Sequence, residues 1–176
     1  IAKVVAEGPS KQMQERLKVR AARPGEKPRG DGPRHIGYTT KEYVALQDKV
    51  GIAKSLIATA KIWEYTESKP TYNIWSSEED VYKWVKNAPG RMYGLAGYNP
   101  YDIDGSVNNI KKAVKEYGFK GVYIHSLGFN MRVDDRRFYP LYETCVQLDI
   151  PVSMQMGHSL EVMPSEVGRP MALDMP

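Results

Sequence analysis

The sequence predicts an α/β fold in which parallel strands alternate with helices. The chain has 176 residues, of which 41% are apolar, enough to bury one core. Helical patterns and short apolar runs alternate along it, so that four helix-to-strand pairs can be recognised. A hairpin turn is too short to contain a helix, whereas a helical crossover returns the chain in the same direction. The strands that each helix joins are therefore predicted to be parallel.

The four predicted strands are short apolar segments that each follow a helix. They cover residues 52–60, 92–98, 120–126 and 150–156. The first helix is capped by Thr39 and stops at Gly51. A capping box of Ser76 and Glu79 opens the second helix, and the third covers residues 103–117.

The fourth helix follows Asp134 or Asp135, either of which can cap it. Its buried side is predicted to consist of Tyr139, Leu141, Cys145 and Leu148. Because Cys145 is the only cysteine, the chain forms no internal disulfide. No apolar run of about 18 residues and no secretory segment is present, so a soluble, cytoplasmic protein without a membrane partner is expected.

Residues 1–38 are predicted to form a basic arm or long loop that is rich in proline and glycine. Over residues 1–34, nine Lys or Arg residues stand against four acids, whereas the rest of the chain is close to neutral. Such an arm can bind nucleic acid or wrap a partner subunit. No nucleic-acid-binding motif accompanies it, which favours a solvated or subunit-wrapping arm.

Polar residues follow two of the predicted strands at the edge where parallel sheets place their active sites. His125 and Gln155 occupy these positions. Because side chains alternate across a strand, Tyr123 shares a face with His125, and Ser153 shares one with Gln155. The apolar face should meet the helices, so the polar face is predicted to line the mouth of a barrel.

Each candidate site residue has a structural alternative. His125 can orient a substrate carboxylate or act as acid or base, or it can be a histidine satisfied in the barrel wall. His158 can reach the mouth or remain in a loop. The remaining candidates for substrate binding are Arg132, Tyr98, Asn99 and Tyr123. The alternatives are pairing of Arg132 with Asp134 or Asp135, and plain packing of Tyr98 and Asn99.

Three segments resemble one known family: GFKGVYIHSLGF at 118–129, DDRRFYPLYETCVQLDIPVSMQMGH at 134–158, and MPSEVGRP at 163–170. They are similar to the amidohydrolase-related, aminocarboxymuconate semialdehyde decarboxylase-like family of TIM-barrel metal-dependent hydrolases. The resemblance implies that residues 39–176 form a partial barrel of about four parallel strands with outer helices. It also implies an enzyme that hydrolyses or decarboxylates a small carboxylated or aromatic substrate, with Zn or Mn as the cofactor.

The sequence departs from that family at the metal site. The His-x-His motif that the resemblance places on the first strand is absent, and Gln155 stands where a histidine is expected. An amide oxygen is a weak zinc ligand, so the metal site is incomplete in this chain, and its ligands are unknown. His125, Gln155 and His158 stay as the catalytic candidates. A non-catalytic binding or assembly subunit is the alternative function.

The length also bears on the assembly. A TIM barrel needs about 200 residues or more, so we expect that strands are missing from the sequence or that a partner supplies them. A homo-oligomer is one such arrangement. An open, doubly wound sheet that binds a nucleotide is the alternative fold, but it predicts a glycine-rich phosphate loop that is absent from the sequence.

Overall fold

The computed structural model describes residues 39–66 and 69–157. Its main sheet contains four strands, β1 (Ser55–Ala58), β4 (Met92–Gly97), β5 (Val122–Ile124) and β6 (Val152–Met154), in the order β1-β4-β5-β6. All neighbouring strands pair in parallel, as predicted, although each strand is shorter than the sequence suggested. The arm predicted over 1–38 lies outside the described residues.

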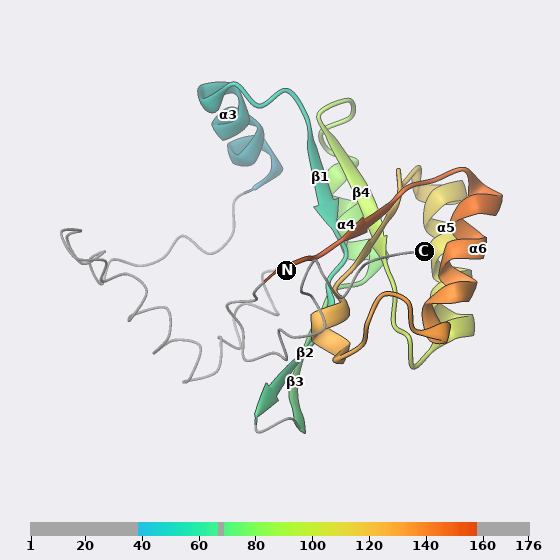
Figure 1. Ribbon diagram of the computed structural model, residues 1–176. Coiled ribbons are helices and arrows are strands. Elements are labelled where there is room, and N and C mark those ends of the chain that lie inside the picture. Colours follow the sequence, from blue (N-terminus) through green and yellow to red (C-terminus); the bar gives the residue numbers. More distant parts are fainter. Residues whose placement is uncertain (1–38, 67–68, 158–176) are drawn as a thin grey trace.

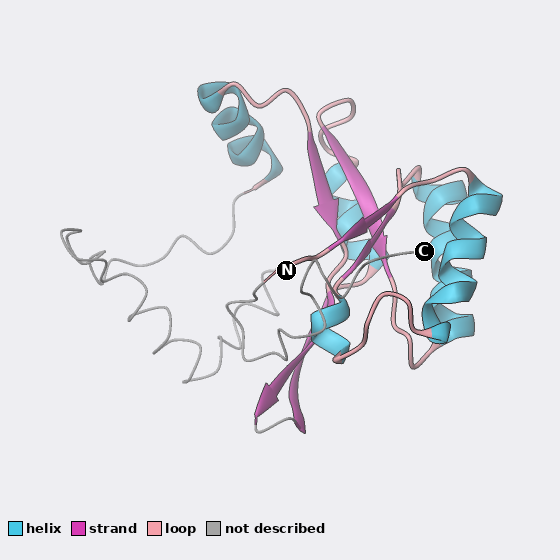
Figure 2. Ribbon diagram, viewed as in Figure 1, coloured by secondary structure: helices cyan, strands magenta, loops and turns pink. Residues whose placement is uncertain are grey.

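Helices cover one face of this sheet (Figures 1 and 2). They are α4 (Glu78–Val85), α5 (Ile103–Tyr117) and α6 (Tyr139–Leu148). Helix α3 (Thr40–Val50) lies toward the start of β1 (Figure 1), and the short 3-10 helices η1 (Ser126–Phe129) and η2 (Arg136–Phe138) follow β5 in the chain. Helices α4 and α5 pack against β4, and α6 packs beside α5. None of the helices in the described part of the chain is long and apolar enough to cross a membrane.

The register of the strands divides the sheet into two faces. Ala96 pairs with Val122, and Ile124 pairs with Met154, and all four residues belong to the core under the helices or pack against it. The intervening residues point the other way. We call this second side the inner face; its residues are Leu56, Ala58, Tyr93, Leu95, Gly97, Tyr123 and Ser153.

Two of the four predicted helix starts are confirmed, and those of α4 and α6 differ from the prediction. Thr39 and Glu42 form a capping box before α3, and α5 covers the predicted residues and ends at Gly118 in the left-handed region (φ 67°). Helix α4 is capped one residue later than predicted, by Ser77. The Ser76 hydroxyl instead accepts a hydrogen bond from the Ala60 N–H at 2.8 Å, which ties the start of α4 to the end of β1.

The fourth helix also begins differently from the prediction. Asp135 caps η2, whereas α6 begins at Tyr139 without a side-chain cap. Tyr139 was predicted to be buried but is 51% exposed, because the preceding Phe138 fills the core position. Cys145 is buried as expected, and burial raises the pKa of its thiol to about 11.

A hairpin was not predicted at all. Strands β2 (Lys61–Thr66) and β3 (Lys69–Trp75) pair antiparallel directly after β1, with an irregularity between Glu64 and Tyr65. The sequence interpretation assumed that a helix follows every strand, and it therefore passed over this aromatic-rich segment. The hairpin projects from the end to which the parallel strands point and contacts η1 (Figure 1).

The cap of α5 offers a test of the fold. The Asp102 carboxylate accepts the Gly105 N–H at 3.2 Å, so Asp102→Ala should lower the free energy of unfolding by about 1 kcal/mol. Asp104 lies in the same first turn without being the cap, and Asp104→Ala should cost less. Urea denaturation of the full-length protein measures both, and equal losses would contradict this role of Asp102.

Candidate functional site

The C-terminal ends of β4, β5 and β6 lie along one edge of the sheet. His125 directly follows β5, and Gln155 directly follows β6. Since β5 and β6 are neighbours, the two predicted residues lie at the same edge. This is the edge at which parallel α/β folds place their active sites.

Gln155 is fixed by hydrogen bonds with two groups on β5, one of which accepts and one of which donates. The Gln155 N–H donates to the Ile124 carbonyl at 3.0 Å, and the Tyr123 hydroxyl donates to Gln155 Oε1 at 3.1 Å. The second bond orients the side chain, because it holds the amide oxygen toward the Tyr123 hydroxyl. The NH2 group of the amide therefore points away from that hydroxyl. Gln155 is therefore prepared to act as a hydrogen-bond donor.

His125 is held by its own loop. The imidazole is 6% exposed, and its Nδ1 accepts the Gly128 N–H at 3.0 Å, so that it caps η1. A neutral ring that accepts at Nδ1 carries its hydrogen on Nε2. The geometry thus favours His125 as a donor to a developing negative charge over its use as a general base. Its ring lies 6.3 Å from that of Tyr123, at 68°.

Tyr98 and Asn99 serve local structure. Tyr98 is 1% exposed, and its hydroxyl donates to the Arg137 carbonyl at 2.5 Å. Burial raises the pKa of Tyr98 to about 12, so the phenol stays protonated at neutral pH. The Asn99 Oδ1 accepts the Tyr101 N–H at 3.1 Å in the turn after β4. Both placements agree with the packing alternative.

Arg132 is also engaged locally. Its guanidinium makes a bidentate pair with Asp134, at 2.9 and 2.8 Å, on the exposed surface. Arg137 pairs in the same way with Asp135, and these hydrogen bonds lower the pKa of that carboxyl to about 2. The ion-pair alternative thus describes what the structure shows for Arg132. His158 lies outside the described residues.

The sequence interpretation missed Lys61. Its ammonium donates to the Ser76 carbonyl at 3.1 Å and lies 3.7 Å from the Glu78 carboxylate, and the two side chains are only 15% and 9% exposed. Glu78 in turn accepts the N–H of Gly97, the last residue of β4, at 3.2 Å. One signal was available, because Lys61 follows the apolar segment of β1 much as His125 follows β5.

The described residues do not fit a metal ion by themselves. Within 39–66 and 69–157, no three His, Cys, Asp or Glu side chains lie where they could hold one. The Gln155 oxygen already accepts from Tyr123, and the Nδ1 of His125 accepts from Gly128.

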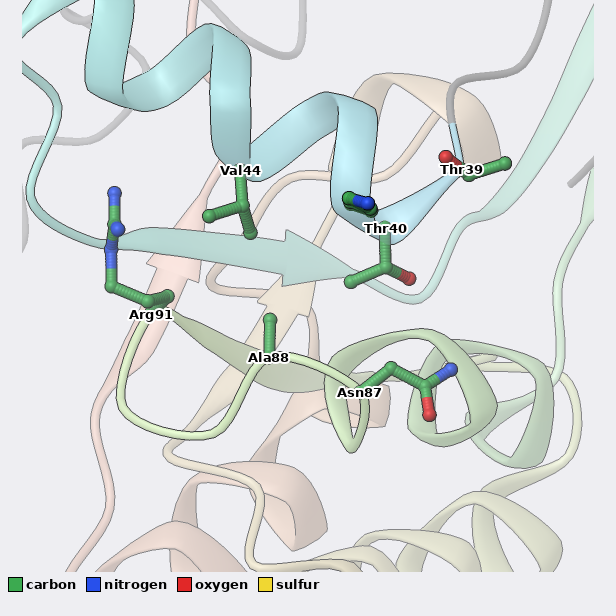
Figure 3. A pocket seen from close by; sticks show the side chains of 7 residues that line it. Thr39, Thr40, Val44, Asn87, Ala88 and Arg91 are labelled. Atoms are coloured by element: carbon green, nitrogen blue, oxygen red, sulfur yellow. The ribbon is translucent and has the colours of Figure 1, made fainter.

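A cavity of about 590 Å³ lies elsewhere, between the start of α3 and the loop after α4 (Figure 3). Arg91, one of its lining residues, directly precedes β4, so the cavity is at the opposite edge from His125. The Arg91 guanidinium is bound by Asp48 at 2.7 Å and by the Ala53 carbonyl at 2.7 Å. These contacts indicate a structural role in joining α3 to the sheet.

Solved structures share this fold. The 5-carboxyvanillate decarboxylase of Novosphingobium aromaticivorans, with bound manganese and 3-methoxy-4-hydroxy-5-nitrobenzoic acid, aligns with a TM-score of 0.56 at 21% identity; the match covers 95% of this chain and 43% of that one. The enzyme of the same name from Sphingomonas paucimobilis gives 0.54 at 19% identity, with 73% and 41% covered. A TIM-barrel protein of Bordetella bronchiseptica gives 0.54 at 20% identity, with 69% and 41% covered.

The chain thus spans less than half the length of these structures. The four parallel strands with their outer helices correspond to part of a TIM barrel. None of the curated proteins matches the chain. The sequence profile described as Amidohydrolase matches residues 14–175, which is most of the chain. The chain therefore belongs to the amidohydrolase family.

Proposed function

We propose that the complete protein is an enzyme that removes the carboxyl group from a small aromatic acid. The observation that carries the proposal is the position of two oriented groups, His125 and the Gln155 amide, at the C-terminal edge of the sheet. Two of the solved structures that share the fold are decarboxylases of an aromatic carboxylate, which supports this substrate class. Hydrolysis of a related substrate is the second reaction type compatible with the family.

Decarboxylation makes defined demands on the site. The bond between the ring carbon and the carboxyl carbon breaks, carbon dioxide leaves, and the electron pair remains on the ring carbon, which takes up a proton. Charge on the substrate oxygens therefore changes during the reaction, and fixed donors can stabilise it. We assign this role to the Nε2–H of His125 and the NH2 group of Gln155. Tyr123 acts as a positioning residue, since its hydroxyl orients Gln155.

A divalent ion, Zn or Mn, is proposed as the cofactor of the complete protein. The Novosphingobium decarboxylase contains manganese, which supports this class of ion. The described residues do not hold an ion on their own, and we propose that its ligands come mainly from the remainder of the protein. His158 is a candidate among the residues that the structure does not describe.

The barrel is proposed to be completed by further chain of the same protein or by a second subunit in a homo-oligomer. The coverage of less than half of the related structures supports either arrangement. A small molecule is the proposed partner, and nucleic acid is not. The composition, with its single cysteine, favours a cytoplasmic location.

A non-catalytic binding subunit is the second candidate. Gln155 favours it, because this residue stands where the family resemblance expects a metal-binding histidine. In this alternative, the edge that contains His125 binds a ligand without converting it.

The first test is turnover. The full-length protein, incubated with a panel of hydroxybenzoic acids and with Mn²⁺ or Zn²⁺, should release carbon dioxide and the matching phenol. Chromatography and carbon dioxide capture measure the two products. Tight binding of these acids without any product would favour the binding subunit, and the appearance of hydrolysis products from amide or ester analogues would favour hydrolysis.

The proposed catalytic role of His125 can be tested separately from its structural role as the N-cap of η1. Asparagine is a good N-cap and can accept the Gly128 N–H, but it lacks the Nε2–H. His125→Asn should therefore leave the free energy of unfolding nearly unchanged while it lowers kcat about 100-fold, the scale of losing one donor to a developing charge. His125→Ala should reduce both stability and kcat. Full activity in the asparagine variant would show that His125 is only a structural cap.

Gln155 gives a test of metal dependence. Gln155→His adds an imidazole ligand and should raise the zinc affinity of the full-length protein without increasing turnover. Gln155→Ala removes the oriented amide and should lower kcat/KM about tenfold, the scale of a hydrogen bond to a charged group. Elemental analysis and steady-state kinetics measure these effects. Stoichiometric zinc in the native protein that disappears in Gln155→Ala would identify Gln155 as a metal ligand instead.

A further inference from the structure

We propose that Lys61 binds the carboxylate of the substrate at the mouth of the barrel. This inference rests on the proposed function and assigns to it a residue at the base of the hairpin. It follows from three observations: the side of the sheet on which Lys61 lies, the contact of the next residue, Ile62, with the His125 loop, and the way in which the charge of Lys61 is held.

The Lys61 side chain lies on the inner face of the sheet. A Cβ atom built on Gly97 would come within 2.7 Å of Lys61 Cγ and 3.2 Å of Lys61 Cε. Side chains of β4 alternate, and Ala96 points into the core under the helices. Gly97 therefore faces the opposite side, and the Lys61 stem lies across it. The missing side chain at Gly97 provides the space for this stem.

The segment around Lys61 also touches the elements that carry the candidate catalytic residues. Gly97 on β4 is the register partner of Tyr123 on β5. The Lys61 stem therefore packs over the strand next to the one that contains Tyr123. The following residue of the chain, Ile62, reaches the His125 loop. A Cβ atom built on Gly128 would lie 2.9 Å from Ile62 Cγ2 and 3.2 Å from His125 Nδ1. Lys61 thus lies against β4, and the residue after it contacts the loop of His125.

The charge of Lys61 is held in place and largely removed from water. Its ammonium donates to the Ser76 carbonyl at 3.1 Å, while Glu78 lies 3.7 Å away, beyond hydrogen-bond distance. Glu78 is itself fixed by the Gly97 N–H. A buried ion pair often contributes no more stability than apolar residues of the same shape. A pre-positioned, poorly hydrated cation on the inner face suits a carboxylate ligand.

The experiment compares a charged ligand with its neutral counterpart. Calorimetry on the full-length protein measures the affinity for a panel of hydroxybenzoates and for the matching hydroxybenzamides, which lack the negative charge. Lys61→Met should weaken the binding of the hydroxybenzoates about tenfold or more, the scale of a hydrogen bond between charged groups. Binding of the amides should change less than about twofold, and Lys61→Arg should recover part of the lost affinity.

Two further variants test whether the loss of affinity in Lys61→Met is only a structural effect. Lys61→Met leaves the Glu78 carboxylate without its cation, so the double variant with Glu78→Gln removes both charges and should show the same selective loss. Lys83→Met removes a lysine that pairs with Glu79 at 3.3 Å on the exposed side of α4 and should change neither affinity. Thermal unfolding of each variant checks that it is folded.

The outcomes separate this inference from the proposed function. Equal weakening of acids and amides in the double variant would overturn the role of Lys61 and leave a structural ion pair. If the native protein decarboxylates hydroxybenzoates and KM is unchanged in Lys61→Met, only the role of Lys61 is wrong. If the native protein neither binds nor converts any hydroxybenzoate of the panel, the proposed function fails, and this inference fails with it.

Discussion

The tight packing of β4 on both of its faces is the constraint on which the other elements depend. On the outer face, a Cβ atom at Gly94 would lie 2.3 Å from the Phe119 ring, so only glycine lets this ring close over the strand. On the inner face, Gly97 leaves room for the stem of Lys61. Because β4 also pairs with both β1 and β5, these two glycines set how closely the helices approach on one side and the hairpin on the other.

Much of the fold can be predicted from the sequence, because helix caps and apolar segments are local signals. The strand order and the approximate extent of α5 follow from them. The hairpin β2–β3 could not be recognised by the same reasoning, since a helix was expected after each strand. Tyr139 and Phe138 show a second limit, because either aromatic residue can fill the core position and tertiary packing chooses Phe138.

The candidate site was predictable in position but not in chemistry. Strand ends placed His125 and Gln155 at one edge, whereas the hydrogen bonds that determine their roles come from Gly128 and Tyr123. These partners depend on side-chain and loop geometry that periodicity does not contain. Lys61 shows the same limit, because its relation to Gly97 arises from the turn into an unpredicted hairpin.

The state of Cys145 has a practical consequence for chemical work on this protein. It is the only cysteine of the chain, it is 3% exposed, and burial raises its pKa to about 11. Thiol reagents attack the thiolate, so near neutral pH the folded chain offers them almost no target. A cysteine introduced on the surface would then be the single reactive thiol, and a probe attached there would report on one chosen position without removal of the native residue.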